Sequence, residues 1–286
     1  MRLFMSTYTY EESVRWMRQQ PEHSELVKLC YLDEENYTAA QRFASSEEFT
    51  EITKLLGLNN SSKKFKILDL GCGNGIASYA LASLGHDVVA VDPDDSASVG
   101  LTATQKLGSM VHNGSISTVQ AFAESLPFSD STFDIVYTRQ ALHHFSDLYK
   151  GLNECSRVLK PNGLLLATRE HVINNDIQLQ EFLENHLLHQ LHAGENAYPL
   201  EIYTSALYKA GFRKVKTLAP FANVVNHFPT SNADIAGMLY ESLSRKVGRT
   251  PASFLAKVSL FEKVYRYYLS RKCNFPGRLY SFLCSK

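Results

Sequence analysis

The chain has 286 residues, 44% of them hydrophobic, and its 29 lysines and arginines balance 29 aspartates and glutamates. That length supports one large domain, or one domain with a cap, and the balanced charge argues against a nucleic acid as partner. No apolar run approaches the ~20 residues of a membrane-spanning helix. The first residues also lack the apolar stretch of a signal peptide, so we expect a globular protein with no leader.

The five cysteines favour a reducing compartment. They are odd in number, include no CxxC pair, and stand at Cys30, Cys72, Cys155, Cys273 and Cys284. Disulfide frameworks and zinc sites use paired, regularly spaced cysteines. We therefore expect free thiols and a cytoplasmic location.

Residues 1–62 carry helical patterns and precede the first expected strand. Helices are expected over residues 11–20, 22–32, 36–44 and 46–56. The last of these begins at Ser45 or Ser46 with Glu48 close behind, which is typical of a capped helix start. The segment holds ten acids and six bases, which alone indicates only a solvated face.

The strongest pattern in the chain is an apolar run that ends in alternating glycines. Residues 65–70 are mostly apolar and are followed by Gly71, Gly73 and Gly75. Glycine permits positive φ and removes the Cβ where a ligand approaches the backbone, so a buried strand turning sharply into a helix is predicted. A dinucleotide fingerprint would need glycine where Ile76 stands. Residues 69–75, DLGCGNG, instead resemble motif I of the S-adenosylmethionine-dependent methyltransferases with a Rossmann-like fold.

A second landmark follows at the distance that this resemblance implies. Residues 86–91 form another strand pattern, which ends at Asp92, 21 residues after Gly71 (92 − 71). A carboxylate about 20 residues past the glycine turn, at the tip of the next parallel strand, can accept hydrogen bonds from both ribose hydroxyls of a cofactor. Asp92 is therefore predicted to bind the ribose, whereas Asp94 and Asp95 are expected to be solvated.

Two later segments extend the resemblance. Residues 122–128, FAESLPF, are similar to the D-A-E-x-L-P-F pattern that meets adenine, except that Phe122 stands where the family has an acid. Adenine is then expected to be held by packing from Phe122 or Leu126 and by the chain near Ala123 and Glu124. Residues 157–164, RVLKPNGL, closely match the family signature R-x-L-K-P-x-G.

The resemblance implies a Rossmann-like α/β fold. We expect a seven-stranded sheet, mostly parallel with the last strand antiparallel, with helices on both faces. Strands are expected near residues 65–70, 86–91, 117–121, 133–138, 164–168, 213–218 and 279–284. The domain hypothesis is a helical cap over 1–62, a cofactor-binding core over 63–219, a basic helical insertion over 220–276 and a final core strand over 277–286.

The implied cofactor is S-adenosyl-L-methionine. The predicted cofactor-binding residues come from the glycine turn, the neighbouring strand ends, the adenine segment and two arginines, namely Asp69, Gly71, Cys72, Gly73, Gly75, Asp92, Pro93, Ala123, Glu124, Arg139 and Arg42. In similar methyltransferases the N-terminal region forms a lid, which makes Arg42 and Tyr37 candidates for the methionine carboxylate, with a surface role as the alternative. Cys72 is expected to be a small packing residue and not a nucleophile.

The resemblance points to the type 11 branch of methyltransferases, which modifies small molecules. We expect the acceptor to be a hydroxyl of a metabolite or sugar-like compound, which needs a base to take its proton. Candidate bases follow the fourth and fifth strands, at the ligand-binding edge of such sheets, and are His143, His144, Glu170 and His171. Two alternatives remain, a methyltransferase acting on RNA or protein and a non-catalytic cofactor-binding partner. Balanced charge and the lack of an Asn/Asp-Pro-Pro-Tyr/Phe motif weigh against nucleic acid.

A histidine-rich helix is expected over residues 176–191. His186, His189 and His192 would then share one stripe. Nothing around them supplies the context of a zinc motif, so no metal is expected. Contact with a polar substrate and ordinary surface histidines are the alternatives.

The C-terminal region is locally basic. Residues 242–286 hold ten bases and one acid, Glu262. Helices are expected over residues 232–245 and 252–270. A solvated helix face is one interpretation, and an anionic substrate or peripheral contact with a membrane surface is the other. We expect the insertion to fold over the carboxyl edge of the sheet, beside the acidic cap.

Overall fold

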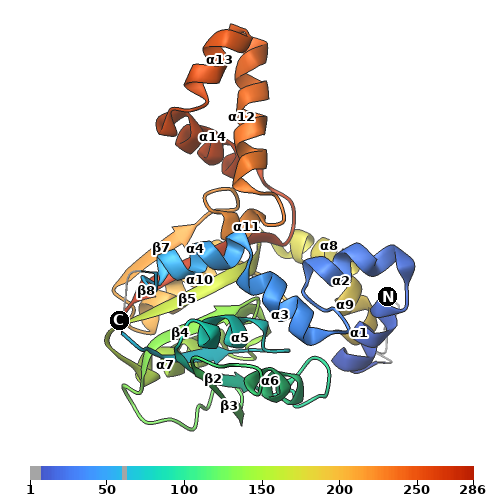
Figure 1. The fold of residues 1–286 in the computed structure, drawn as a ribbon, viewed down its shortest axis with the longest axis vertical. Coiled ribbons are helices and arrows are strands. Elements are labelled where there is room, and N and C mark those ends of the chain that lie inside the picture. The colour runs from blue at the N-terminus through green and yellow to red at the C-terminus, as the bar shows by residue number, and fades with distance from the viewer. Residues whose placement is uncertain (1–7, 60–62) are drawn as a thin grey trace.

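The fold is built on one sheet, drawn in Figure 1. The computed structural model describes residues 8–59 and 63–286. Within those residues the sheet has eight strands in the order β3-β2-β1-β4-β5-β8-β7, with β6 paired to β5. The strands are β1 (Lys66–Leu70), β2 (Asp87–Asp92), β3 (Ser115–Gln120), β4 (Phe133–Arg139), β5 (Leu159–Ile173), β6 (Tyr198–Pro199), β7 (Lys214–Leu218) and β8 (Arg278–Ser285).

Strand direction brings several loops to one edge. β1 pairs in parallel with β2 and β4, and β4 pairs in parallel with β5. β8 runs antiparallel to both β5 and β7. The expected Rossmann-like sheet with an antiparallel last strand is confirmed, and β6 is a two-residue addition beside Val172 and Ile173. The carboxyl ends of β1, β2, β4 and β5 therefore share the edge at which open α/β sheets bind ligands.

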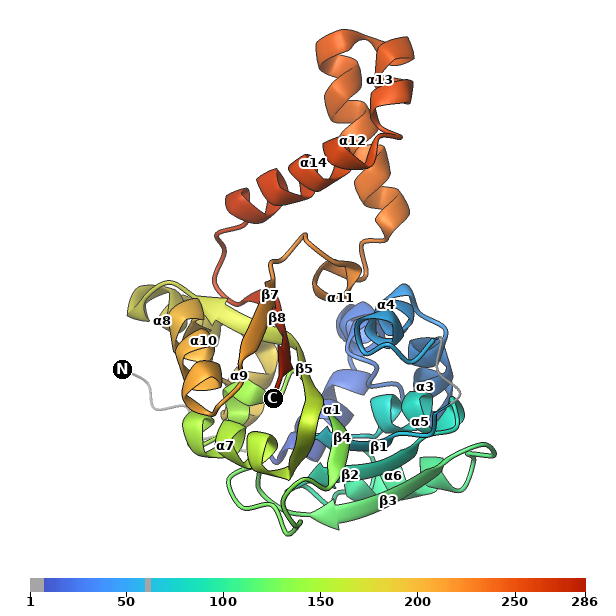
Figure 2. The ribbon, with the colours of Figure 1, turned by 90° about the vertical axis from the view of Figure 1, so that its left-hand side faces the viewer.

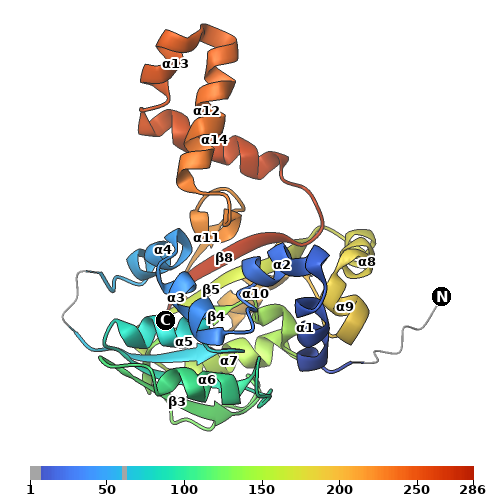
Figure 3. The same ribbon diagram turned by 45° about the vertical axis from the view of Figure 1, so that its right-hand side comes forward.

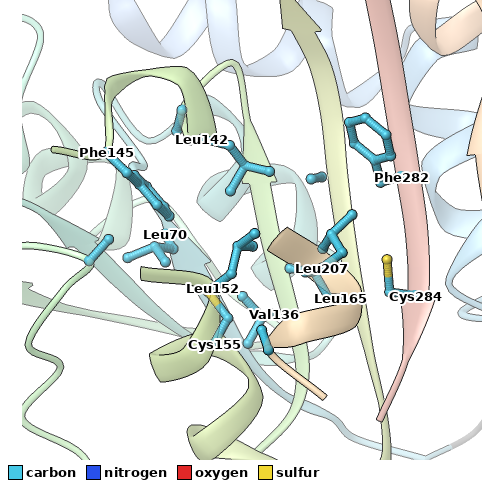
Figure 4. Packing of buried hydrophobic residues seen from close by; sticks show 14 of the residues in the cluster. Leu70, Val136, Leu142, Phe145, Leu152, Cys155, Leu165, Leu207, Phe282 and Cys284 are labelled. Atoms are coloured by element: carbon cyan, nitrogen blue, oxygen red, sulfur yellow. The ribbon is translucent and has the colours of Figure 1, made fainter. Parts of the chain in front are cut away.

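Helices cover both faces of the sheet, as Figure 2 shows. One face carries α7 (Leu148–Val158) and α10 (Leu200–Lys209), whose Leu152 and Leu207 pack among the strands in Figure 4. The other face carries α5 (Ile76–Ser83) and α6 (Leu101–Gly108), with a second apolar cluster. Burial on both faces explains why the strands read as nearly continuous apolar runs.

The N-terminal cap divides into two parts. Its elements are α1 (Tyr10–Arg18), a 3-10 turn (Pro21–His23), α2 (Ser24–Leu29), α3 (Asn36–Ala44) and α4 (Glu47–Leu55). The start of α4 is capped by Ser46, whose hydroxyl accepts a hydrogen bond from the Phe49 amide. Apolar side chains of α3 and α4 join the cluster around α5. In contrast, Val14 and Met17 of α1 pack with apolar side chains of α9 (Leu187–His192), and these two helices lie side by side in Figure 3.

The single helix expected over residues 176–191 is wrong. The chain forms α8 (Asp176–Asn185) and α9, and they separate at His186, whose φ of −88° and ψ of 111° are extended. His186 therefore leaves the expected histidine stripe. Its Nδ1 atom lies 3.9 Å from a carboxylate oxygen of Glu195.

The insertion forms an arm that stands away from the sheet in Figures 1 and 2. The arm consists of α12 (Asn232–Val247), α13 (Arg249–Leu255) and α14 (Ser259–Lys272), whereas the preceding α11 (Val224–His227) packs against the body, where Val225 joins the apolar cluster around α5. The arm does not fold over the carboxyl edge as expected. Its base is joined to the cap, where the Asn232 amides donate to Glu47 at 3.0 and 3.1 Å. The helix expected over 252–270 is two helices, α13 and α14. None of the helices in the described ranges has the length and apolar character needed to cross a membrane.

Candidate cofactor and acceptor site

The last two residues of β1 and the turn that follows them, residues 69–75, are here called the cofactor turn. Its three glycines have positive φ values of 71°, 51° and 78°. A Cβ added to Gly71 would lie 2.5 Å from the Cβ of Ala141, in the loop after β4. Glycine is therefore required at this position by both conformation and space, and the turn touches the loop that carries the histidine candidates.

Asp92 stands at the tip of β2, where the sequence predicts it. Its carboxylate accepts hydrogen bonds from the amides of Gly73 at 2.8 Å and Asp94 at 3.0 Å. Burial raises the pKa of Asp92, and the two amide bonds oppose that rise. The carboxylate is thereby fixed in orientation beside the cofactor turn.

Asp69 is a second carboxylate in the same turn. It is buried and accepts a hydrogen bond from the Ser78 hydroxyl at 2.6 Å. Burial raises its pKa to about 7, against the effect of the Ser78 bond. Two carboxylates and a backbone without side chains are chemically suited to the ribose hydroxyls and the ammonium group of S-adenosylmethionine.

Cys72 lies inside the turn and is buried. Burial raises the pKa of its thiol well above the ordinary value, with a further rise from Asp69 and Asp92. A thiol held neutral is neither a nucleophile nor a metal ligand, so the geometry supports the packing role.

The cap reaches the loop after Asp92 through α1. The Ser98 amide donates to the carboxylate of Glu11 at 2.8 Å, which ties α1 to the loop after β2. Burial raises the pKa of the Tyr10 hydroxyl, and the charges of Cys30, Glu195, Asp92 and Asp94 raise it further. The hydrogen bond to Ser98 thus holds α1 beside the loop that follows Asp92.

The expected adenine side is only partly built as predicted. Ala123 is buried, and Phe122 is 67% exposed. The carboxylate of Glu124 accepts hydrogen bonds from the Ser146 hydroxyl at 2.9 Å and the Asp147 amide at 3.1 Å. Glu124 therefore fastens the loop after β4. Pro93 is exposed next to Asp92.

Both arginines that were expected near the cofactor have partners within the protein. Arg42 binds the Asp33 carboxylate at 2.7 and 2.8 Å. Arg139 binds Glu48 of α4 at 2.9 and 3.2 Å, and the Glu48 side chain is fully buried. Burial alone would lower the pKa of Arg139, but the Glu48 charge raises it. A cofactor role for either arginine remains a prediction.

Glu170, at the end of β5, holds the loop after β4. Its fully buried carboxylate accepts hydrogen bonds from the amides of Ala141, Leu142 and His143 at 3.2, 3.2 and 3.3 Å. The fourth donor is the Nδ1 atom of His143 at 2.7 Å. Four donors occupy this carboxylate, so Glu170 positions the loop and is poorly placed to accept a substrate proton.

The three candidate histidines differ in environment. His143 is buried, which alone would lower its pKa, but Glu170 and Glu195 raise it to about 9. Burial lowers the pKa of His171 to about 3, and its Nδ1 atom donates to the Gly277 carbonyl at 2.9 Å. The side chain of His144 is 44% exposed, and its Nδ1 atom donates to the Gly194 carbonyl at 3.1 Å. Partial burial and the charge of His143 lower the pKa of His144.

Sequence reasoning missed Glu195, which joins these histidines from the loop between α9 and β6. Its carboxylate lies 3.6 Å from His143 Nε2 and 3.8 Å from His144 Nε2. Burial alone would raise its pKa, but the surrounding histidines lower it to about 2. The glutamate stands in a short loop without a motif, so no sequence signal marks it. We call His143, His144, His171, His186 and Glu195 the histidine cluster.

Arg169 is the second residue that sequence reasoning missed. It lies in β5 directly after Thr168 and has a positive φ of 61°. Its Nη1 atom donates hydrogen bonds to the carbonyls of Val225 and Phe228. Its buried Nε atom has no hydrogen-bond partner, and neither does the buried Tyr31 hydroxyl. Burial lowers the pKa of Arg169. Among the described residues no carboxylate forms an ion pair with it.

Comparison with known proteins agrees with this geometry. A family model described as a methyltransferase domain matches residues 68–167, which include the whole cofactor turn. The uncharacterized methyltransferase YcgJ of Bacillus subtilis is 34% identical over 154 residues, 54% of this chain and 57% of that protein. The ubiquinone biosynthesis O-methyltransferase of Rhizobium etli is 29% identical over 133 residues, 46% of this chain and 52% of that protein. The chain thus spans about half the length of the curated relatives that it matches.

Solved structures share the fold. A candidate sarcosine dimethylglycine methyltransferase of Galdieria sulphuraria has a TM-score of 0.56 at 18% identity and covers 96% of this chain and 98% of its own. Phosphoethanolamine N-methyltransferase 2 of Haemonchus contortus, in complex with phosphomonomethylethanolamine and S-adenosylhomocysteine, has a TM-score of 0.53 at 18% identity and covers 90% of this chain and 59% of its own. Residues 68–167 therefore match a methyltransferase domain of the type 11 branch, the class of domain that uses S-adenosylmethionine, and the solved structures share its fold.

Proposed function

We propose that this protein methylates a hydroxyl group of a small, anionic metabolite or sugar-like compound. The observation that carries the proposal is the contact between the cofactor turn and the loop after β4, at Gly71 and Ala141. That contact brings His144 to the same edge as Asp92. The resemblance to an enzyme named as an O-methyltransferase supports a hydroxyl acceptor.

The cofactor's contribution is a methyl group already activated by its sulfonium leaving group. Asp92 and Asp69 would hold it, and α1 would exclude water above it. The remaining task of the chain is to align the acceptor hydroxyl and take its proton.

His144 is the side chain best suited to take that proton. Its Nδ1 atom donates to a carbonyl oxygen, so Nε2 carries the lone pair. Half of its ring is open to solvent, whereas His143 and Glu170 are buried against each other. We therefore assign the base to His144, and assign His143 and Glu170 to holding the loop.

Labelled cofactor and a metabolite extract test the assignment. Wild type should add one methyl mass to an acceptor in the extract. His144→Gln, which cannot accept the proton, should lower turnover by about 10²-fold or more, while the Kd of S-adenosylhomocysteine stays within a few-fold. His112→Gln, at an exposed histidine between α6 and β3, is the matched control and should keep full turnover. Equal turnover of the two variants would overturn the role of His144, and no transfer by wild type would overturn the function.

Arg169 supports an anionic acceptor. A buried guanidinium without a carboxylate partner is costly, and an anion from the acceptor would offset that cost. The partnerless Tyr31 hydroxyl could donate to the same anion. Arg139 cannot serve, because Glu48 already neutralises it.

Inorganic phosphate is a simple probe of this arginine. Millimolar phosphate should raise the melting temperature of wild type and not that of Arg169→Met, since a ligand specific for the native state stabilises by mass action. Arg42→Met, which removes an arginine paired with Asp33, is the control and should keep the phosphate effect. An unchanged effect in Arg169→Met would remove the support for an anionic acceptor.

The arm supports peripheral contact with an anionic membrane surface. Apolar side chains are widely exposed on α13 and α14, including Phe254 at 70% and Leu260 at 64%. Exposed Lys257 and Lys263 stand among them. This mixture of bases and apolar side chains favours a lipid interface over water alone.

Vesicle sedimentation tests the arm. Vesicles of phosphatidylserine should bind the protein more than vesicles of phosphatidylcholine, and added salt should release it. Lys257→Glu with Lys263→Glu should weaken the binding at least several-fold. Lys106→Glu with Lys150→Glu, the same charge change on exposed body residues, should not, and equal losses would argue against a role of the arm.

We also propose a cytoplasmic location. All five cysteines are free thiols, and Cys72, Cys155 and Cys284 are buried. Alkylation of the protein in intact cells, followed by mass spectrometry, should find them reduced, whereas any disulfide would contradict this location.

A further inference from the structure

We propose that His143, His171 and Glu195 bind a divalent transition-metal ion of the zinc type. One ligand atom from each of the three residues lies within 4.8 Å of the others. They come from three distant parts of the chain, the loop after β4, the strand β5 and the loop after α9. Nothing in methyl transfer itself requires this arrangement, so the site goes beyond the proposed function.

The hydrogen bonds of both histidines leave the metal-binding nitrogen free. The Nδ1 atom of His143 donates to the Glu170 carboxylate at 2.7 Å, and that of His171 donates to the Gly277 carbonyl at 2.9 Å. A carbonyl or carboxylate on one ring nitrogen fixes the tautomer, so in the neutral ring the lone pair lies on Nε2, and a metal that binds there must displace any second proton. Histidines that ligate zinc are usually oriented by a carboxylate or carbonyl in this way.

The free atoms face one another. His143 Nε2 lies 3.6 Å from an oxygen of Glu195, too far for a good hydrogen bond. Two atoms that both carry lone pairs repel unless a cation lies between them. The cation is either a second proton on His143 or a bound metal, and a metal would also engage His171, which a proton on His143 would not.

His186 offers a further ligand and a route of entry. Its Nδ1 atom is buried, has no hydrogen-bond partner and lies 3.9 Å from Glu195. The ring also lines a pocket of about 290 Å³ together with Glu181, Phe182, Asn185 and Pro276. An ion could therefore reach the cluster from solvent past His186, without passing the cofactor turn.

The donor set selects the kind of metal. Imidazole nitrogens with one carboxylate suit zinc and its neighbours, whereas magnesium and calcium prefer oxygen ligands alone. In a tetrahedron with bonds of about 2.0 Å, ligand atoms are about 3.3 Å apart, so the present spacing must contract on binding. Glu195 can make that movement, since its loop contains Ala193 and Gly194 at positive φ and Gly194 is exposed.

Isothermal titration with Zn²⁺ on the metal-free full chain tests the site. Wild type should bind one Zn²⁺ with a Kd of micromolar or below. His171→Asn and Glu195→Gln should each weaken binding at least about tenfold. His112→Asn, an exposed histidine elsewhere, is the matched control and should bind as wild type does.

Two further outcomes keep the test decisive. Each variant must match the far-ultraviolet circular dichroism spectrum of wild type without metal. If a variant does not, the absorption spectrum of wild type with Co²⁺ is measured instead, and its intensity should indicate a four-coordinate site with nitrogen ligands. A wild-type Kd weaker than about 1 mM, or equal affinity in His171→Asn and His112→Asn, overturns the proposal and leaves a proton between His143 and Glu195. Failure of methyl transfer has no bearing on this result, because the readout is metal binding alone.

Discussion

The two halves of the ligand-binding edge are built in different ways. The cofactor half uses residues close together in sequence, with the cofactor turn at the end of β1 and Asp92 ending the next strand. The proposed acceptor half gathers Arg139 from the end of β4, Glu48 from α4 and Glu195 from the loop after α9. Local chain geometry therefore governs the first half, and long-range pairing of charges governs the second.

This contrast predicts which substitutions the fold can absorb. A change in the cofactor half should act mainly on ligand binding and on one turn. A change in the acceptor half should act on global stability, since buried charges there hold separate elements together. Four substitutions would sharpen or break the comparison, and they follow in order of decreasing effect.

Glu48→Gln should cause the largest loss. It leaves the buried guanidinium of Arg139 without a counter-charge, which costs about 3 to 5 kcal/mol of unfolding free energy. Urea unfolding followed by circular dichroism measures the loss. Adding Arg139→Met should restore most of it, because an apolar side chain removes the unpaired charge. A loss below about 1 kcal/mol would mean that the pair does not fasten α4 to the sheet.

Asp92→Asn should weaken cofactor binding by about 2 to 3 kcal/mol, roughly a hundredfold in the Kd of S-adenosylhomocysteine. The amide keeps the size of the side chain but loses the charge that strengthens its hydrogen bonds. Isothermal titration gives the Kd, and Asp95→Asn, at an exposed neighbour, should leave it unchanged. Equal values for the two variants would place the ribose elsewhere.

Gly71→Ala should destabilise the protein by about 2 to 3 kcal/mol, through positive φ and the clash with Ala141. Gly57→Ala is a matched control, because Gly57 also has a positive φ, of 69°, but nothing lies within 4 Å of its added Cβ. It should cost only about 1 kcal/mol. Adding Ala141→Gly to Gly71→Ala should restore the stability lost to the clash but not the stability lost to the positive φ. Chemical unfolding of the single and double variants measures both parts. Equal costs at the two glycines would show that the turn and the loop are not in contact.

Asp69→Asn should change how stability depends on pH. The folded pKa of about 7 lies above the ordinary 3.8, so the folded state binds more protons between these values. The stability from Asp69 is therefore full below about pH 3.8 and is lost as pH rises through about 7. The variant lacks this loss, so its stability relative to wild type should rise with pH between those limits. Unfolding curves at pH 5 and pH 8 decide it, and a constant difference would contradict the raised pKa.

Sequence patterns were sufficient for the parts that local chemistry dictates. Apolar runs on a doubly covered sheet predict β1, β2 and β4, and alternating glycines predict the cofactor turn. The separation of Asp92 from Gly71 reflects one strand–helix–strand unit, whose length is fixed by the layer geometry. These features need no knowledge of distant residues.

Other parts could not be predicted, because their causes are distant in sequence. The break at His186 accompanies a contact with Glu195, which no periodic pattern marks. The base of the arm is joined to the cap where Asn232 meets Glu47. The partners that occupy Glu170 are backbone amides of a loop 27 to 29 positions earlier, which no side-chain motif reveals.

The packing of α1 against α9 has a thermodynamic consequence. One helix, α9, packs against α1, which is tied to the loop after Asp92, and it also precedes the loop that contains Glu195. A ligand that draws Glu195 inward must change the free energy that holds α1, and linkage requires the effect to be reciprocal. The factor by which Zn²⁺ changes the Kd of S-adenosylhomocysteine should equal the factor by which S-adenosylhomocysteine changes the Kd of Zn²⁺. A measured factor of one would show that α9 transmits nothing, and any other value would make the two sites one coupled system.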